Sequence, residues 1–412
     1  MTYTVAGIDI HKKVLMVVVA GIEAGVPEWN LQRRRFGTGA HELQQLATWL
    51  RQQGVEEAVM ESTAQYWKAV WYALEPHMKL QLAQAFSNRA PRGRKHDFRD
   101  AERLVRRLLA NELILSFVPP PEQRVWRSLT RTRCQLAVQR VRVHNHVEAL
   151  LEEMRIKLSS VISDLFGASG RRILWALANG ETDPQKLAGL GSQQLRCTEE
   201  QLIDALTSQV VPEQQHLLRL HLEELELIDT HIDQLNQHIA HSLQAHQDAV
   251  VRLAEVPGFG VDSAQQVIAE VGPQAATFAT AGNLSSWAGT CPGREESAEH
   301  NHNSRSPKGN KYLRRLLTEA AQAAVKTKGS HFQAVFRRLL PRLGYKQALW
   351  AIVHRLSRLV WKILHQGLHY IEQGPQRDPK ARRQRASTLA RALRNLGYKV
   401  EITPLDLSLA AG

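Results

Sequence analysis

Cysteine is scarce in this 412-residue chain. The three cysteines, Cys134, Cys197 and Cys291, lie far apart, and none forms a C-x-x-C pair. This spacing argues against a disulfide framework and against a zinc module built on paired cysteines. The pattern is typical of a protein from a reducing cytosol.

Long hydrophobic runs are also missing. The longest apolar stretch, VLMVVVAGI, is far too short to cross a bilayer. The N-terminal stretch MTYTVAGIDIHKK has no basic region followed by an apolar segment, so it does not have the form of a signal peptide. We therefore expect a cytoplasmic protein with no membrane partner.

Acidic residues are outnumbered by basic ones. The chain has 53 Lys+Arg against 40 Asp+Glu, which gives a formal net charge of +13. Such a balance favours a polyanionic partner, of which nucleic acid is the commonest. A basic solvated surface without any such partner would give the same composition.

The first part of the chain alternates between two periodicities. In chain order it predicts three strands, a helix, a strand, a helix, a strand and a helix. The strands are TYTVAGIDI, VLMVVVAG, WNLQRRRFG, VEEAVMES and KLQLAQAF, and the last helix is DFRDAERLVRRLLANEL. This order predicts a mixed sheet flanked by helices and resembles the ribonuclease-H fold. We assign residues 1–118 to this α/β domain.

The middle of the chain, residues 119–250, predicts two long helices joined by a Gly-rich connector, GASGRRILWALANGETDPQKLAGLG. The second helix has a seam of apolar residues at a three-and-four spacing, typical of a coiled-coil spacer. The seam consists of Leu218, Leu222, Leu225, Ile228, Ile232, Leu235 and Ile239. Its partner helix can belong to the same chain or to another copy, and packing of each helix on its own domain explains the spacing equally well.

The stretch VPGFGVDSAQQVIAEVG, residues 256–272, opens a helix with a Pro-Gly-x-Gly turn. Gly258 and Gly260 would allow close approach of the backbone, and amides at a helix N-terminus can bind phosphate without reading bases. The stretch resembles a helix-hairpin-helix element, with a plain helix-entry turn as the alternative. We assign residues 251–374 to a mainly α-helical domain and residues 375–412 to a basic tail.

Two aspartates stand three positions apart in the basic stretch RKHDFRDAERL. Asp97 and Asp100 can simply be a helix N-cap and a first-turn acid that complements the helix dipole. However, Asp9 lies in an otherwise apolar strand, where an unpaired buried carboxylate would be costly, and Glu61 ends the fourth strand. The first and fourth strands are neighbours in a ribonuclease-H-like sheet, and the third helix would bring the aspartate pair to the same edge.

Four carboxylates at one edge of a sheet would suit a divalent cation. Mg²⁺ or Mn²⁺ takes carboxylate and water oxygens and can clamp the attacking and leaving oxygens of a phosphodiester. The sequence therefore predicts a metal site that acts on nucleic acid.

Several motifs together resemble the DEDD transposases of bacterial insertion sequences, a group that includes the Piv-type DNA invertases and the bridge-RNA-guided recombinases. They are GIDIHKK, MES, KHDFRDAERL followed by FVPP, VPGFG, and CPG-x-x-x-S with KGNKYLRRLL downstream. The resemblance covers nearly the whole chain before the basic tail. It implies a RuvC-like N-terminal domain with a metal-binding tetrad, a coiled-coil spacer, and a C-terminal transposase domain with a serine nucleophile. The tetrad positions are Asp9, Glu61, Asp97 and Asp100.

The position that matches the family serine is Ser297. A serine hydroxyl needs a base or a metal to become a good nucleophile, and the family assembles such a site from different subunits. The resemblance thus implies a dimer or tetramer held through the helical spacer. The family serine is commonly followed by glycine at the next position or the one after, whereas Ala298 and Glu299 follow here, which is a departure from the family pattern. Ser304 and Ser306 are competing candidates in the same loop.

The sequence predicts an insertion-sequence transposase that binds, cleaves and rejoins DNA, guided by an element-encoded bridge RNA and associated with the bacterial nucleoid. Arg103 is expected to face the nucleic-acid backbone, together with the other residues of the predicted interface. These are Arg92, Arg94, Lys95, Arg99, Gly258, Gly260, Arg305, Lys308 and Lys311. The alternatives are a metal-dependent nuclease like the Holliday-junction resolvases, with Ser297 merely structural, and an inactive nucleic-acid-binding remnant of a transposon.

Overall fold

The computed structural model describes residues 3–22, 30–88, 97–191, 195–293, 295–297, 300–303, 306–374, 379–395 and 397–401. The chain divides into two compact units, Met1–Pro120, called unit 1, and Pro121–Gly412, called unit 2. Within these described ranges, no helix is long and apolar enough to span a membrane.

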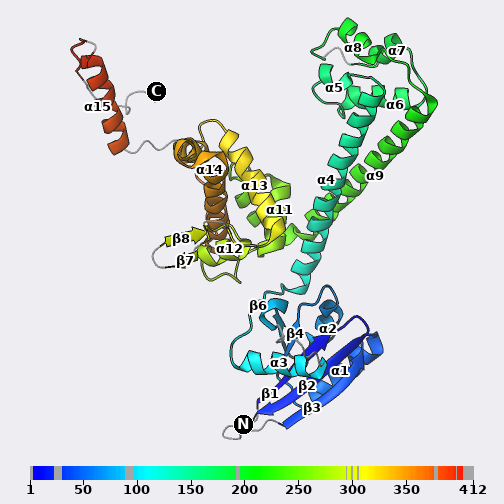
Figure 1. Ribbon diagram of the computed structural model, residues 1–412, viewed down its shortest axis with the longest axis vertical. Helices are drawn as coiled ribbons and strands as arrows, with labels where there is room; N and C mark the ends of the chain where they lie inside the picture. The colour runs from blue at the N-terminus through cyan, green and yellow to red at the C-terminus, as the bar shows by residue number, and fades with distance from the viewer. Residues whose placement is uncertain are drawn as a thin grey trace. The chain divides into compact units, whose positions relative to one another are not determined.

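Unit 1 is a mixed β-sheet with helices on both faces (Figure 1). Its elements are β1 (Tyr3–Ile10), β2 (Val14–Ile22), β3 (Asn30–Gly37), α1 (Ala40–Gln52), β4 (Glu57–Glu61), α2 (Trp67–Leu74), β5 (Lys79–Ala83), the 3₁₀ helix η1 (Ala85–Asn88), α3 (Asp97–Leu109) and β6 (Leu115–Ser116). The predicted order of strands and helices is confirmed, with η1 and the short β6 as additions.

The strand order in the sheet is β3-β2-β1-β4-β5-β6. The pairs β1–β2, β2–β3 and β5–β6 are antiparallel, whereas β1–β4 and β4–β5 are parallel. The prediction that the first and fourth strands are neighbours is therefore confirmed. Residues 15–20 of β2 are all buried, because helices cover both faces of the sheet, and this explains the unbroken apolar run in the sequence.

The fifth strand is shorter than predicted. It ends at Ala83, and residues 85–88 turn into η1 instead of continuing the strand. The amide and the hydroxyl of Ser87 both donate to the carbonyl of Gln84, at 2.9 and 2.7 Å, and this local bonding replaces the strand ladder. The turn places Asn88 in the interior, where it is 3% exposed.

Unit 2 begins with a pair of long helices that pack along each other (Figure 1). The elements of this part are α4 (Pro121–Glu153), α5 (Leu158–Val161), α6 (Ala168–Ala178), α7 (Pro184–Gly189), α8 (Glu199–Leu206) and α9 (Pro212–Ser242). The predicted seam of α9 finds its partners within the chain, because its first four residues are buried in one core with α4 and the short helices.

The prediction that the Gly-rich segment is only a connector is wrong, since the segment folds into α6 and α7. Ile173, Leu174 and Leu177 on α6 are buried in the same core as the long helices. Asp183 caps α7, where its side chain accepts from the amide of Gln185 and Pro184 occupies the first turn. Apolar spacing and capping thus outweigh the glycines.

The remainder of unit 2 is a second, mainly helical core. Its elements are the 3₁₀ helix η2 (Gln244–His246), α10 (Gln247–Ala254), α11 (Val261–Val271), α12 (Ala281–Ala288), β7 (Glu295–Ser297), β8 (His300–Asn303), α13 (Lys311–Lys326), α14 (His331–Gln366) and α15 (Pro379–Asn395). Helices α10 to α14 contribute most of this core, and α14 is interrupted at Gly344, where φ is +73°. The polar loop predicted before α13 contains a short antiparallel hairpin, β7–β8.

Candidate active site

Asp9 and Glu61 lie at the same end of two neighbouring parallel strands. Ile8 of β1 is opposite Met60 of β4, so the next residue on each strand is one of the two acids. Parallel strands lie about 4.8 Å apart, and side chains alternate between the two faces of the sheet. Both acids therefore share the face of Gly7, the face that α3 covers.

Helix α3 runs antiparallel to β1 and brings its first turn toward Asp9. Val105 packs against Val5 near the start of the strand. Further along the strand, a Cβ atom added to Gly7 would lie 2.2 Å from the carbonyl oxygen of Ala101. Continuing in the same sense, the turn from residue 97 to residue 100 lies beyond Gly7, at the level of Asp9.

Asp100 is 9% exposed and belongs to this first turn. Asp97 is the first residue of α3, and its side chain lies outside the described residues. The structure thus places Asp9, Glu61 and Asp100 on one face at one end of the sheet. Among the described residues, no group of three or more His, Cys, Asp or Glu side chains is arranged to hold a metal.

A chain of polar contacts connects Glu61 to Asp100. The side-chain amide of Asn88 donates to Glu61 Oε2 at 3.0 Å. Arg103 Nε donates to the backbone oxygen and to Oδ1 of Asn88, at 3.2 and 3.3 Å, and Arg103 Nη2 donates to Asp100 Oδ1. Arg103, predicted to face nucleic acid, contacts two residues of this site, and its i, i+3 spacing from Asp100 allows their ion pair.

Two further residues of this site escaped the sequence analysis. His11 follows Asp9 by two positions, and its Nε2 lies 3.2 Å from Asp9 Oδ2. The geometry of that contact is not that of a hydrogen bond, and Nε2 is buried. Histidine two residues after a strand-end acid is a signal that the sequence offered. Asn88 offered none, since its place depends on the turn at η1.

The serine-containing loop is held at its base. Ser297 ends β7 and is opposite His300 of β8, and its side chain lies outside the described residues. A Cβ atom added to Gly309 would lie 2.4 Å from the carbonyl oxygen of Ala288, so the segments before and after the hairpin are in contact. Ser304 is outside the described residues, whereas Ser306 Oγ accepts a hydrogen bond from the indole of Trp350 at 2.6 Å.

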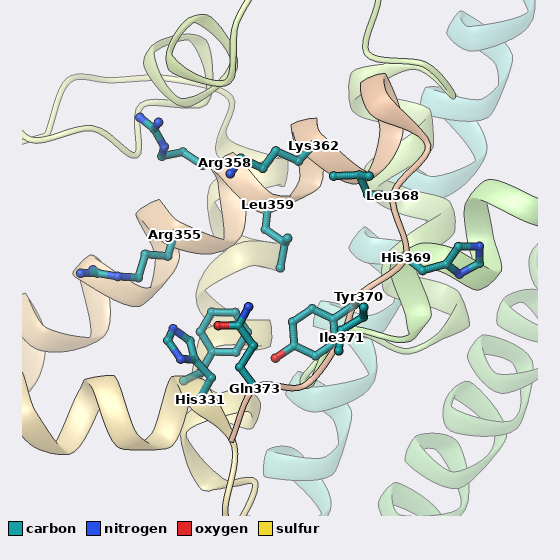
Figure 2. A pocket seen from close by; sticks show the side chains of 11 residues that line it. His331, Arg355, Arg358, Leu359, Lys362, Leu368, His369, Tyr370, Ile371 and Gln373 are labelled. Atoms are coloured by element: carbon teal, nitrogen blue, oxygen red, sulfur yellow. The ribbon is translucent and has the colours of Figure 1, made fainter. Parts of the chain in front are cut away.

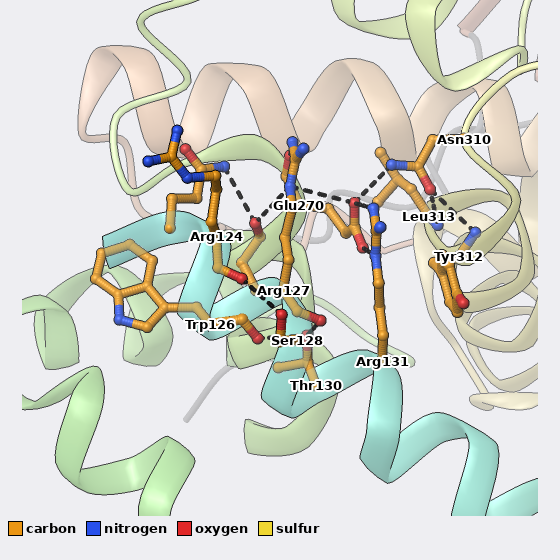
Figure 3. A network of polar contacts seen from close by, with 12 residues as sticks. Arg124, Trp126, Arg127, Ser128, Thr130, Arg131, Glu270, Asn310, Tyr312 and Leu313 are labelled. Carbon is orange, nitrogen blue, oxygen red and sulfur yellow. Dashed lines mark hydrogen bonds and ion pairs between the residues drawn. The ribbon is translucent and has the colours of Figure 1, made fainter. Parts of the chain in front are cut away.

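Hydrogen bonds and an ion pair connect the end of this loop to α4 and α11 (Figure 3). The carboxylate of Glu270 is fully buried and accepts from Arg131 Nε and Nη2 at 2.7 and 2.8 Å. Asn310 Nδ2 donates to Glu270 Oε2 at 2.6 Å, and Asn310 Oδ1 accepts from the amide of Tyr312 to cap α13. The end of the loop is thus fixed by an ion pair with α4.

The residues of the predicted nucleic-acid interface fall into three groups. Arg99, Lys308, Lys311 and Gly260 are exposed. Gly258 has φ of +91°, and a Cβ atom added to it would lie 2.1 Å from the carbonyl oxygen of Ala320, so its close approach is to α13. Outside the described residues lie Arg92, Arg94, Lys95 and Arg305.

Comparison with known proteins gives matches in both units. A family model of IS110-type DEDD transposases, described as "Transposase", matches residues 6–156. A second model, "Transposase IS116/IS110/IS902 family", matches residues 250–337. The two matched ranges include all four tetrad positions and Ser297, respectively.

Two relatives support the same grouping. A "Probable family 20 transposase" of Pseudomonas aeruginosa is 27% identical over 314 residues, which is 73% of this chain and 81% of the relative. An "Insertion element IS900 uncharacterized 42 kDa protein" of Mycobacterium paratuberculosis is 28% identical over 145 residues, which is 34% of this chain and 36% of that protein.

Proposed function

Because this chain belongs to the IS110 family of DEDD transposases, we propose that it cleaves and rejoins the DNA of an insertion sequence through a covalent serine–phosphate step. The proposed catalytic residues are Asp9, Glu61, Asp97, Asp100 and the nucleophile Ser297. The observation that carries the proposal is the placement of Asp9 and Glu61 on adjacent parallel strands, beneath the helix that begins with the aspartate pair.

The tetrad fits Mg²⁺ or Mn²⁺ by the chemistry of its donors. All four side chains offer carboxylate oxygens, which these hard cations prefer. The buried Nε2 of His11 lies beside Asp9 and can serve as a further polar contact. When bound, the cation would supply Lewis-acid stabilisation of the phosphate charge and would make a bound hydroxyl more acidic.

The chain's own residues prepare this acidic site. Asn88 donates to Glu61 and fixes one of its oxygens, leaving the other available as a ligand. Arg103 offsets the charge of Asp100 and also orients Asn88. The two residues therefore keep acidic side chains close together in a half-buried site, where like charges would otherwise repel.

Ser297 performs the covalent step. Its Oγ forms a bond to the DNA phosphorus while the bond from phosphorus to one deoxyribose oxygen breaks, and the serine proton is transferred to that oxygen, which leaves as a hydroxyl. A deoxyribose hydroxyl of the recipient strand then attacks the same phosphorus and displaces Ser297, which regains its proton. Each step exchanges one phosphate ester for another, so rejoining requires no external energy source.

We assign residues 1–118 to a RuvC-like catalytic domain, 119–250 to a coiled-coil spacer, and 251–374 to a transposase domain with a helix-hairpin-helix-like turn at Gly258 and Gly260. Residues 375–412 form a basic tail that contains α15. A bridge RNA and assembly into a dimer or tetramer belong to the same proposal. The net charge of +13 supports the binding of nucleic acid.

The test is capture of the covalent adduct. The purified chain is incubated with end-labelled DNA of the element ends and MgCl₂, and labelled protein is detected on a denaturing gel. Ser297→Ala and Asp9→Asn should each abolish the adduct, while DNA binding changes less than about twofold because many phosphate contacts carry the affinity. Ser306→Ala is the matched control and should retain the adduct.

Mixing the two inactive variants tests the shared site. Ser297→Ala combined with Asp9→Asn should restore part of the activity if one subunit supplies the serine and another supplies the acids. Full strand cleavage by Ser297→Ala alone would favour the resolvase-like nuclease. Binding without any cleavage by the unaltered chain would favour the inactive remnant.

A further inference from the structure

A cavity of about 570 Å³ lies in unit 2, away from Ser297 in sequence (Figure 2). One wall is the second half of α14, with Arg355, Arg358, Leu359 and Lys362. The opposite wall is the extended segment that follows α14, which we call the strap, residues 368–373. A volume of this size accommodates a base with its sugar.

The strap is fixed in place by aromatic packing and by the carboxylate of Glu255, the residue that follows α10. The ring of Tyr370 stacks on that of Phe332, with centroids 6.2 Å apart. Glu255 Oε2 accepts from the amide of Tyr370 at 2.9 Å, and Glu255 Oε1 lies 2.7 Å from His369 Nδ1. Specific contacts within unit 2 therefore hold this wall of the cavity in place.

A second carboxylate, that of Glu372, is also engaged with local groups. It accepts from the amides of His331 and Gly374, both at 2.8 Å, and from Tyr370 Oη at 2.9 Å. The acceptor oxygens of Glu372 are therefore used by residues of the strap and its two neighbouring segments. These contacts do not place either carboxylate against the cations of α14.

The cations of α14 are not neutralised. Arg355, Arg358 and Lys362 follow an i, i+3, i+7 spacing, so they lie along one face of the helix. All three are exposed, and across the described ranges none forms an ion pair with a carboxylate. Although Arg355 reaches solvent, partial desolvation and, to a lesser extent, the nearby Arg338 lower its pKa.

We propose that this cavity binds single-stranded DNA, with phosphates on Arg355, Arg358 and Lys362 and one unstacked base against the strap. A cationic groove beside aromatic and apolar side chains is the usual way to hold a single strand. The helical rise of about 1.5 Å per residue puts the outer cations about 10 Å apart, a span of two to three phosphates.

The apolar side of the cavity suits a base more than an extended acidic peptide. Leu359 points across the cavity toward Tyr370, Gln373 lies beside that ring, and His331 lies on the far side of Gln373 (Figure 2). A flat base would contact Leu359 and Tyr370, and its polar edge would meet the imidazole and amide groups. The inference rests on the proposed function, because strand exchange requires DNA strands to unpair.

The test measures binding to a labelled, mixed-sequence DNA strand of about 15 nucleotides by fluorescence anisotropy, with the full chain. The double variant Arg358→Glu/Lys362→Glu should weaken binding at least about tenfold and lower the salt slope by about 1.4, the value for two phosphates. The control Arg337→Glu/Arg342→Glu changes the charge equally at two exposed residues of α14 outside the cavity, and should change binding less than about twofold.

Two further measurements separate base contact from general charge and from misfolding. Ile371 is 77% exposed, so Ile371→Asp should fold normally and still weaken binding about fivefold or more, by placing an acid on the apolar wall. A strand with 5-iodo-deoxyuridine should photo-crosslink to the strap or to His331, as located by mass spectrometry.

Equal binding by the cavity and control double variants would overturn the proposal, as would crosslinks confined to other segments. Tighter binding of an RNA strand of the same sequence, by about tenfold or more, would overturn the assignment to DNA. Equal competition by duplex DNA would overturn the assignment to a single strand. All these measurements are made in the Ser297→Ala background, so the absence of a covalent adduct affects the proposed function alone.

Discussion

The two ends of strand β4 hold carboxylates in opposite situations. At the start of the strand, Glu57 accepts from Tyr3 Oη at 2.5 Å, from Gln81 Nε2 at 2.7 Å and from Lys79 Nζ at 2.9 Å. At its end, Glu61 on the same face accepts from Asn88, the one donor among the residues that the structure describes. The first acid has its accepting capacity filled, and the second retains some for a ligand.

Glu270 in unit 2 extends the comparison. It is as close to arginines as Asp100 is, yet it is fully buried and both of its oxygens accept hydrogen bonds. Proximity of acids to arginines therefore does not identify a reactive site. A half-open acid with incomplete hydrogen bonding does, because only such an acid can take a new partner without first losing an old one.

The largest expected effect comes from removing the charge of Glu57 and of Glu61 in two separate variants. Glu61→Gln should lower DNA cleavage on the order of 10⁴-fold while the melting temperature stays nearly constant, because it removes a proposed metal ligand and retains the shape of the side chain. Glu57→Gln should leave cleavage within about threefold and lower the melting temperature instead. Cleavage assays and thermal melts of both variants check this; a large loss of cleavage in Glu57→Gln would contradict it.

The next largest effect concerns the filled network of unit 2. Glu270→Gln leaves Arg131, and Arg127 with its Nε 3.6 Å from Glu270 Oε2, without their buried counter-charge, so the free energy of unfolding should fall by about 3–5 kcal/mol. Glu319→Gln breaks the exposed Arg315–Glu319 pair and should cost less than about 0.5 kcal/mol. Urea unfolding followed by circular dichroism measures both; a loss below about 1 kcal/mol for Glu270→Gln would show that the network is not structural.

The fold of unit 1 was accessible from the sequence because its signals are local. The central strands β1, β2 and β4 are short apolar runs, and the order of elements selected the sheet in which β1 and β4 are neighbours. Asp9 and Glu61 were found because a carboxylate in an apolar strand is anomalous by itself.

Other parts of the site depend on contacts that no local pattern encodes. Asn88 enters the site through the turn after β5, and Arg103 turns inward because Asn88 and Asp100 receive it. In the sequence, Glu270 is an ordinary acidic residue of a helix. Only the folded structure shows its contacts with Arg131 of α4 and with Asn310. The connector was misjudged for the same reason, since its helices α6 and α7 contain glycine and depend on packing against the long helix pair.

A smaller effect is expected from a substitution that tests how α3 brings Asp100 to the other acids. Gly7→Ala forces a methyl group onto the backbone of Ala101, so α3 must shift away from β1, at a cost of about 1–3 kcal/mol. The rate of DNA cleavage should fall by more than this loss of stability alone would cause. Asp100 moves with the helix, whereas Glu57 keeps its partners. The control is Gly39→Ala, where no atom lies within 4 Å of an added Cβ. Equal cleavage by the two variants would contradict this placement of α3.

The smallest expected effect is the dependence of stability on pH that arises at Glu57. Burial alone would raise the pKa of Glu57, but hydrogen bonds from Tyr3, Gln81 and Lys79 outweigh it and hold this pKa below its usual value. A carboxyl with a lower pKa in the folded than in the unfolded state stabilises the fold above the unfolded pKa, near 4.3. That stabilisation, on the order of 1 kcal/mol, is lost as pH falls through the folded pKa. Unfolding measured from pH 7 down to about pH 3.5 should therefore show the unaltered chain and Glu57→Gln converging at the acid end. Tyr3→Phe, which removes one donor, should lie between them, and parallel curves for all three proteins would show that the filled end of β4 owes its stability to packing alone.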